Sequence, residues 1–445
     1  MKNFLLLFSL LFFVASITEA QKTAFKNVTV IPMTGENVLQ NHTVLVEGEH
    51  IIAVAPSTEM TLDDQTQVID GMGRFLLPGL AEMHGHVPPT DPPANTPPYY
   101  TDEYVEHTLF LYVAAGITTV RGMLGWPNQL ELKTRVNSGD LIGPNLYLAG
   151  PSFNGNSIDS PQQAIEKVNR QKEEGWDLLK IHPGLTLTEY DAMAETANSL
   201  GIRFGGHVPE DVGIEHAIEM GQETMDHIDG YYRWLQQFEE SEWENRMEYI
   251  VDKTKEAGVW IVPTQALWET IIGAADYEAM KQYDELKYIP VALRENYFGF
   301  VSMRIDERPE SERKQALKEA EWRRKLLRAM NEKEVLILMG TDAPQLFSVP
   351  GFSIHRELPH MAAAGMSPYE ILESGTVNVG KYFSNEDDFG TIAEGQRADL
   401  LLLNNNPLED IAHLKDHAGV MVQGRWYSRE MIDDKLKEIE AAYAK

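Results

Sequence analysis

The sequence of 445 residues contains no cysteine. This absence excludes disulfide bonds, a cysteine nucleophile and thiolate metal sites. Any metal ion must therefore be held by histidine, aspartate, glutamate or an oxygen group derived from lysine.

Basic charge and long apolar runs are also scarce. Acidic residues outnumber basic ones by 68 to 38, a formal net charge of −30, which argues against nucleic acid or an anionic membrane as a partner. The longest apolar stretch, Phe4–Ala15, follows Lys2 and precedes the small-residue site Thr18–Ala20. It is too short to span a bilayer and is typical of a signal peptide, so we predict cleavage after residue 20. The mature protein is then periplasmic or extracellular, with no stable membrane anchor.

Both ends of the mature chain show short β-rich runs separated by turn residues. Neither end could form a core alone, so we predict one small composite β-sandwich domain from residues 21–74 plus 388–445. An amphipathic helix is expected at the C-terminus, with its apolar face formed by Met431, Leu436, Ile439 and Tyr443. The expected strands are Val28–Ile31, Thr43–Val46, Ile51–Val54, Ala398–Leu403 and Gly419–Val422.

Between these ends, strand-like runs alternate with helical ones. This alternation predicts an α/β fold with a parallel sheet, and eight such units predict a closed (β/α)8 TIM-like barrel over residues 75–387. An open doubly wound sheet is the competing fold. The expected strands are 75–83, 117–120, 146–149, 178–181, 202–206, 223–225, 260–262 and 335–339.

Polar side chains close several of these runs. His84 and His86 end the first strand and, one residue apart, face the same side of it. Barrel enzymes keep their chemistry at the C-terminal ends of the strands, so the polar residues that close four other runs are expected to converge there. These residues are Lys180, His207, His227 and Asp342.

The chain resembles the amidohydrolase superfamily, in particular its imidazolonepropionase-like and prolidase-like members. The similar motifs are Leu77–Leu80 before the His pair, Gly116–Arg121, Gly340–Ala343 and Gly390–Leu400. The resemblance implies two divalent metal ions, most often zinc, with His84, His86 and Asp342 on one ion and His207 and His227 on the other. It also implies a carboxylated Lys180 that bridges the two.

The chemistry of these side chains is also consistent with a two-metal site. A lysine ammonium cannot ligate a metal, but as a carbamate it carries two oxygens that suit ions about 3.5–4 Å apart. Such ions activate a water as hydroxide and polarise a carbonyl, while Asp342 moves the proton to the leaving nitrogen. Lys180 as a plain ion-pair partner, or as an electrophile at a single ion, is the alternative.

Substrate contacts are less clear from sequence. Arg121 could bind a substrate carboxylate or form an ion pair across the barrel, and Tyr231, Tyr232 and His355 could line the pocket or pack elsewhere. The same two readings apply to a further group: His182, Trp126, Trp234 and Trp268. The stretch Pro88–Pro98 has six prolines in eleven residues and predicts a rigid wall beside the site.

These features predict an exported metal-dependent hydrolase that cleaves a C–N bond, in an amide or a dipeptide, by metal-activated hydroxide attack. Dipeptidase activity is what the resemblance favours. A cyclic-amide, lactone or ester hydrolase with the same metals is one alternative, and a metal-containing binding protein without turnover is another. The surplus helix expected over residues 231–330 could cover the site or support a homo-oligomer.

Overall fold

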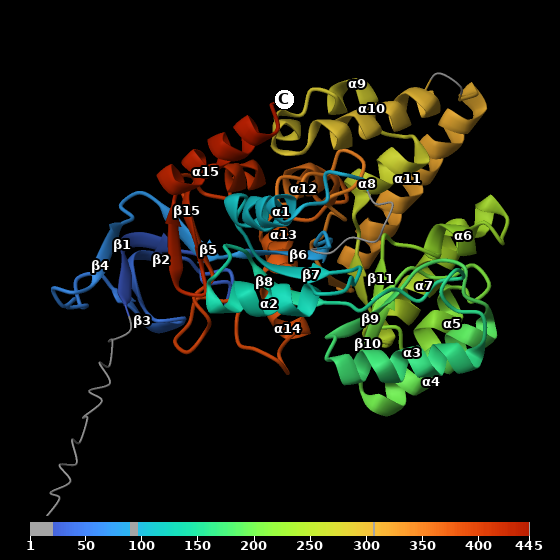
Figure 1. Ribbon diagram of the computed structural model, residues 1–445, viewed down its shortest axis with the longest axis horizontal. Coiled ribbons are helices and arrows are strands. Elements are labelled where there is room, and N and C mark those ends of the chain that lie inside the picture. The colour runs from blue at the N-terminus through green and yellow to red at the C-terminus, as the bar shows by residue number, and fades with distance from the viewer. Residues whose placement is uncertain (1–20, 90–96, 306–307, 445) are drawn as a thin grey trace, which may run out of the picture.

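The computed structural model describes residues 21–89, 97–305 and 308–444. A β-sheet lies at one end of the molecule, and the parallel strands with their helices form the rest (Figure 1). The predicted signal peptide lies outside the described residues. Within these ranges, no helix has the length and apolar character needed to cross a bilayer.

The end sheet combines strands from both ends of the described chain, in the order β16-β15-β14-β5-β1-β2-β3, with β4 paired to β1. All five strand runs expected at the two ends overlap its strands, although Ile31, Ala398 and Asp399 lie just outside them. Its strands are β1 (Lys22–Val30), β2 (Leu39–Glu47), β3 (His50–Pro56), β4 (Gln67–Asp70), β5 (Phe75–Pro78), β14 (Leu400–Leu403), β15 (His417–Val422) and β16 (Arg425–Ser428).

Strand β14 shows why these runs are apolar throughout. Side chains alternate between the two faces of a strand, and both faces of β14 are covered. Leu400 and Leu402 pack in the core of the end sheet, whereas Leu401 and Leu403 pack in the main core of the molecule. The four-leucine run therefore joins the end sheet to the α/β part.

The α/β part contains eight parallel strands at the expected positions. They form a three-stranded sheet, β6-β7-β8, and a five-stranded sheet, β9 to β13. The strands are β6 (Leu80–Gly85), β7 (Ile117–Gly122), β8 (Asn145–Leu148), β9 (Leu178–Ile181), β10 (Arg203–Gly206), β11 (Thr224–Asp226), β12 (Trp260–Val262) and β13 (Leu336–Ile337).

Backbone contacts join the edges of these two sheets. A parallel bridge pairs Ala149, just after β8, with Leu178 of β9. At the other edge, the Met83 N–H donates to the Met339 carbonyl at 2.8 Å. The described strands are thus connected on both sides.

Helices follow most of the parallel strands, and their ends are set by local sequence. In α3, the Ser160 side chain caps the N-terminus, Pro161 is the first residue, and Gly175 ends the helix with φ +88°. The helices are α1 (Asp102–Ala114), α2 (Gln129–Ser138), α3 (Pro161–Glu174), α4 (Leu187–Leu200), α5 (Ile214–Glu219), α6 (Tyr231–Leu235), α7 (Trp243–Glu256), α8 (Gln265–Ile272), α9 (Tyr277–Met280), α10 (Val291–Ile305), α11 (Glu310–Glu332), α12 (Ile354–Ala363), α13 (Pro368–Gly375), α14 (Val377–Tyr382) and α15 (Arg429–Ala442).

Two details differ from the expectation. The strand expected over residues 75–83 is divided at Gly79: β5 belongs to the end sheet, and β6 starts the parallel set. A side chain at position 79 has no room, because an added Cβ would lie 2.2 Å from Thr118 Oγ1. Met431, expected on the buried face of the terminal helix, is 54% exposed, while Leu436 and Ile439 are buried. The division of domains between residues 74 and 75 stays a prediction.

The surplus helix expected after residue 230 forms α6 to α11. Part of it, α9 and α10, lies beside the C-terminal helix α15 at the top of Figure 1. Arg294 of α10 donates to the Tyr443 carbonyl at 3.0 Å, and Lys287 pairs with Glu440 at 3.2 Å. The insertion therefore contacts the end of the chain.

Candidate metal centre

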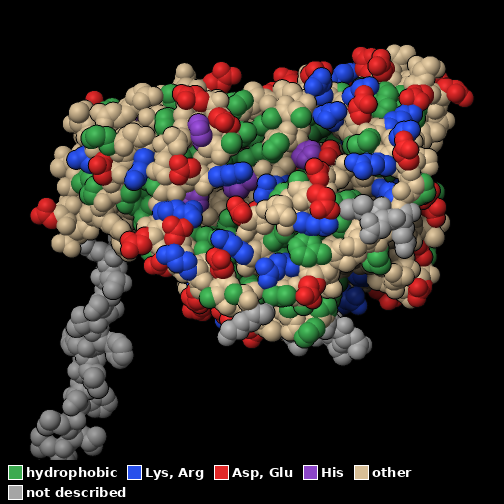
Figure 2. All heavy atoms as spheres, turned by 90° about the horizontal axis from the view of Figure 1, so that it is seen from above, with side chains coloured by type: hydrophobic (Ala, Val, Ile, Leu, Met, Phe, Trp, Pro, Cys, Tyr) green, Lys and Arg blue, Asp and Glu red, His purple; other side chains and the backbone are tan. Residues whose placement is uncertain are grey.

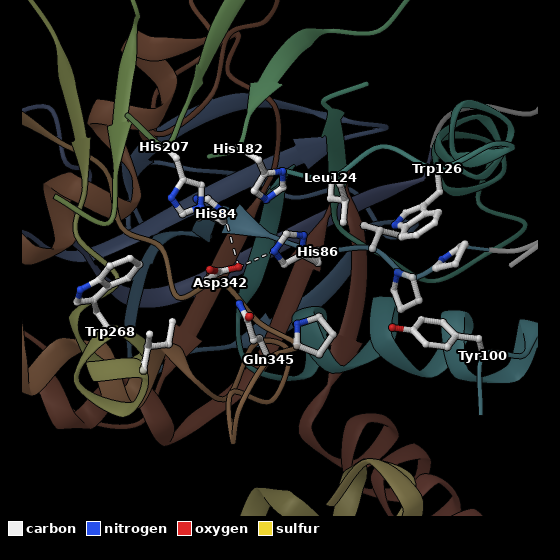
Figure 3. A pocket seen from close by; sticks show the side chains of 15 residues that line it. His84, His86, Tyr100, Leu124, Trp126, His182, His207, Trp268, Asp342 and Gln345 are labelled. Carbon is white, nitrogen blue, oxygen red and sulfur yellow. Dashed lines mark hydrogen bonds and ion pairs between the residues drawn. The ribbon is translucent and has the colours of Figure 1, made fainter. Parts of the chain in front are cut away.

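The end of β6 carries the first part of the site. His84 and His86 extend toward the same side of the strand, as alternation requires, and Asp342 meets them from the segment after β13. His86 Nε2 lies 2.5 Å from Asp342 Oδ1, and His84 Nε2 lies 3.6 Å from the same oxygen (Figure 3). One donor atom from each residue falls within 4.8 Å of the others, which makes this trio a candidate metal site.

The other three expected ligands lie against this trio. Lys180 is fully buried, with Nζ 3.1 Å from His84 Nε2, and His227 Nε2 lies 3.8 Å from Asp342 Oδ2. The His207 and His227 rings are 4.5 Å apart between centroids. We call this group the six-residue cluster: His84, His86, Lys180, His207, His227 and Asp342.

Polar groups behind the cluster orient its imidazoles. His84 Nδ1 lies 2.7 Å from Asp226 Oδ2, and His207 Nδ1 lies 3.1 Å from Asp229 Oδ2. His227 Nδ1 lies 2.7 Å from Thr264 Oγ1. Metal-binding histidines usually have one ring nitrogen held in this way, which leaves the other free to bind the ion.

Apart from His84 Nδ1, whose 2.7 Å contact with Asp226 lacks hydrogen-bond geometry, two buried nitrogen atoms in the cluster have no hydrogen-bond partner among the described residues. They are His227 Nε2, on the side of Asp342, and His86 Nδ1. An unpaired polar atom in a buried position is costly, so such atoms usually have a ligand. Neutral imidazoles and a carboxylate are the donor set that zinc and similar ions prefer, and the residues present fit a divalent metal.

Burial sets the protonation of the cluster. It lowers the pKa of His84 and His227 well below the usual value for histidine, and neighbouring Lys180 adds to this effect in both. Burial also lowers the pKa of Lys180 to about 8. The His84 and His227 imidazoles are therefore neutral and able to bind metal at pH 7, and Lys180 is closer to losing its proton than a lysine in water.

Three acidic residues of the site were missed by the sequence analysis. Asp226 and Asp229 flank His227 in the chain, a proximity that offered a signal for both. Glu82 lies two residues before His84 on β6 and accepts hydrogen bonds from the Thr341 N–H (2.7 Å) and hydroxyl (2.5 Å). Burial raises its pKa to about 8. Glu82 thus ties β6 to the segment that carries Asp342.

The expected substrate contacts are not at the pocket, which is a correction. Arg121 is fully buried and binds both oxygens of Asp226 at 2.9–3.0 Å, because its position in β7 turns it inward. The Tyr231 hydroxyl pairs with Thr254, and the Tyr232 hydroxyl accepts from Gln315. His355 lines a separate hollow with His417.

The pocket beside the cluster has a volume of about 380 Å³. Of the four further candidates from the sequence, His182, Trp126 and Trp268 line the pocket. Trp234 does not line it and donates a hydrogen bond from its indole N–H to Glu215. Pro88 and Pro89 form part of its wall, as the proline-rich stretch predicts, but residues 90–96 lie outside the described residues. In Figure 3, Trp126 and Tyr100 lie on one side of Asp342 and Trp268 on the other.

Comparisons with known proteins found a matching family and similar proteins. The model of the amidohydrolase family matches residues 75–427. An adenine deaminase from Rubrobacter xylanophilus is 22% identical over 407 residues; the match covers 88% of this chain but only 56%, about half, of the deaminase.

Two solved structures share the fold. A Xaa-Pro dipeptidase with bound methionine has a TM-score of 0.70 at 22% identity, covering 92% of this chain and all of the other. A bottromycin amidohydrolase has a TM-score of 0.74 at 18% identity, with 95% of this chain and 90% of the other covered.

Proposed function

The chain belongs to the amidohydrolase family, and we propose that it is a metal-dependent enzyme that hydrolyses an amide C–N bond. One observation carries the proposal: six side chains from five separate strand ends converge in one cluster, and two of their buried nitrogens lack a partner among the described residues. A site that only stabilised the fold would have its polar atoms paired.

The proposed metal content follows the sequence prediction. His84, His86 and Asp342 would hold one divalent ion, and His207 and His227 a second, with zinc the expected metal. Lys180 would bridge them as a carbamate. The burial of Lys180 and its lowered pKa support this, because carboxylation requires the neutral amine.

Bound divalent ions would lower the pKa of a water molecule and polarise the substrate carbonyl. Asp342 has one carboxylate oxygen beside His86 and the other toward His227, so it borders the space where both ions would lie. In our proposal its carboxylate takes the proton from the attacking water and passes it to the leaving nitrogen. Arg121 acts indirectly, since it fixes the Asp226 carboxylate that lies against His84.

The finer fold assignment and the location are part of the same proposal. The backbone contacts at both sheet edges support a closed (β/α)8 barrel over residues 75–387 rather than an open sheet, with a composite β domain from 21–74 and 388–445. Export after cleavage at residue 20 is proposed from sequence alone.

Metal counting combined with an amide-hydrolysis assay tests the function. We expect about two equivalents of zinc per purified chain, release of amine from dipeptide or N-acyl substrates, and loss of that release in Asp342→Asn. Bound metal without turnover of any amide, lactone or ester would favour the binding protein instead. Release of ammonia from adenine would keep C–N hydrolysis but reassign the reaction to deamination.

A further inference from the structure

The charge of the pocket lining carries an inference about the substrate. The fifteen residues that line the pocket include no lysine or arginine. The stretch 90–96, which is next to the lining prolines in the chain but lies outside the described residues, has no basic residue in its sequence either. A substrate carboxylate would find no cationic side chain from this part of the chain.

Three basic residues in or beside the cluster are held by contacts outside the pocket. Lys180 is buried beside His84, and Arg121 is held by Asp226. Arg323 is buried behind Trp268: it donates to the His227 carbonyl, and its guanidinium lies 4.7 Å from the Trp268 ring centroid. None of the three lines the pocket.

The walls of the pocket are apolar and aromatic on both sides of the cluster. Trp126 and Tyr100 lie on one side of Asp342, and Trp268 lies on the other (Figure 3). Trp268 stacks on His227 with a distance of 5.3 Å between ring centroids. Aromatic walls favour flat apolar groups, which gain from burial and from ring contacts. The remaining lining residues on these walls are Val87, Pro88, Pro89, Leu124, Ile271 and Pro344.

Polar recognition away from the cluster comes from side chains other than lysine and arginine. The side chains of His182 and Gln345 line the pocket and have no hydrogen-bond partner in the described parts of the chain. Both can form hydrogen bonds with an amide or a heterocycle. Neither provides the ammonium or guanidinium group that binds a carboxylate strongly.

From these contacts we infer that the substrate is an uncharged amide with apolar, preferably aromatic, groups on both sides of the scissile bond. This rests on the proposed function and narrows it: a free dipeptide, whose carboxylate would lose its hydration without gaining a cation, is a poor substrate. A carboxylate that reached the metals instead would occupy the position of the scissile carbonyl and inhibit. The overall charge of −30 also repels anions at long range.

Binding of a matched ligand pair tests the inference without requiring turnover. N-benzoyl-phenylalaninamide and N-benzoyl-phenylalanine differ only in the C-terminal charge, and calorimetric titration gives Kd for each with metal-free and zinc-loaded protein. We expect the amide to bind about tenfold more tightly or better in the metal-free form. Equal or tighter binding of the carboxylate there would overturn the inference, whatever the catalytic activity.

A charge variant sharpens this test. Gln345→Arg places a cation in the pocket and should raise affinity for the carboxylate more than for the amide. Gln162→Arg, on the exposed face of α3, adds the same charge elsewhere and should leave the ratio of the two Kd values unchanged. An unchanged ratio in Gln345→Arg would contradict the proposed binding position.

Hydrolysis of the same pair separates this inference from the proposed function. Faster cleavage of the neutral compound, at higher kcat/KM, supports both. Faster cleavage of the free acid would support the hydrolase proposal but contradict the proposed preference for an uncharged substrate. If neither compound is cleaved but the amide still binds more tightly, the recognition stands and the amidase proposal fails for this class.

Discussion

Two clusters of buried polar side chains lie toward opposite ends of the parallel strands. The six-residue cluster lies at the C-terminal ends. The other, which we call the junction cluster, begins at the first residue of β8 and joins the parallel strands to the end sheet. It consists of Arg397, Asp399, Asn145 and Gln423, all nine-tenths or more buried.

The junction cluster pairs its polar atoms. Arg397 Nε donates to Asp399 Oδ2 at 2.7 Å, and Asn145 Nδ2 donates to the same oxygen at 3.0 Å. Gln423 donates from its backbone to Asp399 Oδ1 and from its side chain to Asn145 Oδ1, at 2.9 and 2.6 Å. Such a network stabilises the fold and leaves nothing for a ligand.

The six-residue cluster differs in the pairing of its polar atoms. His227 Nε2 and His86 Nδ1 lack hydrogen-bond partners among the described residues. Backbone conformation does not separate the two clusters, because Gln423 of the junction cluster (φ 49°) is left-handed, as are His227 and Asp342 (both 65°). Unpaired atoms mark the end of the strands that is built for a ligand, while full pairing marks the end that is built for stability. Substitutions in the junction cluster should therefore change stability, and substitutions in the six-residue cluster should change metal affinity.

Among the substitutions, Lys180→Ala should show the largest difference in effect between the two clusters. Loss of the bridging group should remove most of the bound metal and lower kcat/KM by more than the ~10–100-fold typical of an outer-shell change. Added formate or acetate should partly restore activity by supplying the missing oxygens. Metal analysis and kinetics measure both effects.

Lys167 offers a matched control for this variant. It is another buried lysine, with Nζ 2.6 Å from the Ser152 carbonyl and a pKa lowered to about 8 mainly by burial, but it lies outside the six-residue cluster. Lys167→Met should keep its metal. Full activity and two metal ions in Lys180→Ala would refute the bridging role.

At the junction cluster, Asp399→Ala should act on stability alone. It leaves the Arg397 guanidinium buried beside fewer acceptors, and breaking a buried ion pair costs about 3–5 kcal/mol. Urea unfolding should show this loss, while the folded variant retains the metal content of the parent. A fall in metal affinity at unchanged stability would mean that the two ends of the strands are not separate in function.

Asp226→Asn tests an acidic residue that contacts both a proposed metal ligand and a buried arginine. Asp226 lies against His84 and also neutralises Arg121, so its loss should weaken metal binding about 10–100-fold, as for other outer-shell partners. Competition with a chelator measures this affinity. Asp177→Asn, which alters a carboxylate paired with Lys133 outside the cluster, serves as the control.

Sequence reasoning located the strand ends but not the direction of every side chain. His84, Lys180 and Asp342 could be predicted because a polar residue after an apolar run is a local signal. The buried position of the Arg121 side chain could not be predicted, because it depends on a contact with Asp226, which lies on another strand far away in the sequence. Tyr231 begins a helix whose buried face turns its hydroxyl toward Thr254, which is again a tertiary contact.

The fold followed the same rule. The alternation of apolar strand-like runs with helical runs predicted the positions of all eight parallel strands, and short β-rich runs predicted the shared end sheet. These strands could be recognised because they are buried on both faces and are therefore apolar along most of their length. The break at Gly79 was missed although Pro78–Gly79 is a dipeptide that often marks a turn or the end of a strand. Asp226 and Asp229 were missed although both lie close to His227 in the chain, because their contacts with His84 and His207 are tertiary.

The smallest expected effect concerns acid stability and two histidines outside both clusters. Burial lowers the pKa of His417 to about 4 and that of His355 to about 3, from an ordinary 6.5. At pH values between the lowered pKa and 6.5, the unfolded chain binds more protons than the folded chain. The free energy of unfolding contributed by each histidine is therefore fully present above pH 6.5 and decreases as the pH falls below that value. Each histidine can contribute about 1 kcal/mol per pH unit in that window.

The contribution of His417 and His355 to this acid loss should be the same with and without metal, because neither belongs to the six-residue cluster. Chemical unfolding at pH 5, 6 and 7 measures it as the part of the slope that His417→Gln removes while metal content stays unchanged. A slope that His417→Gln leaves unchanged would assign the acid sensitivity to His84 and His227, whose pKa burial also lowers. In that case the metal end of the strands, and not the remainder of the fold, would set the stability of the protein in acid.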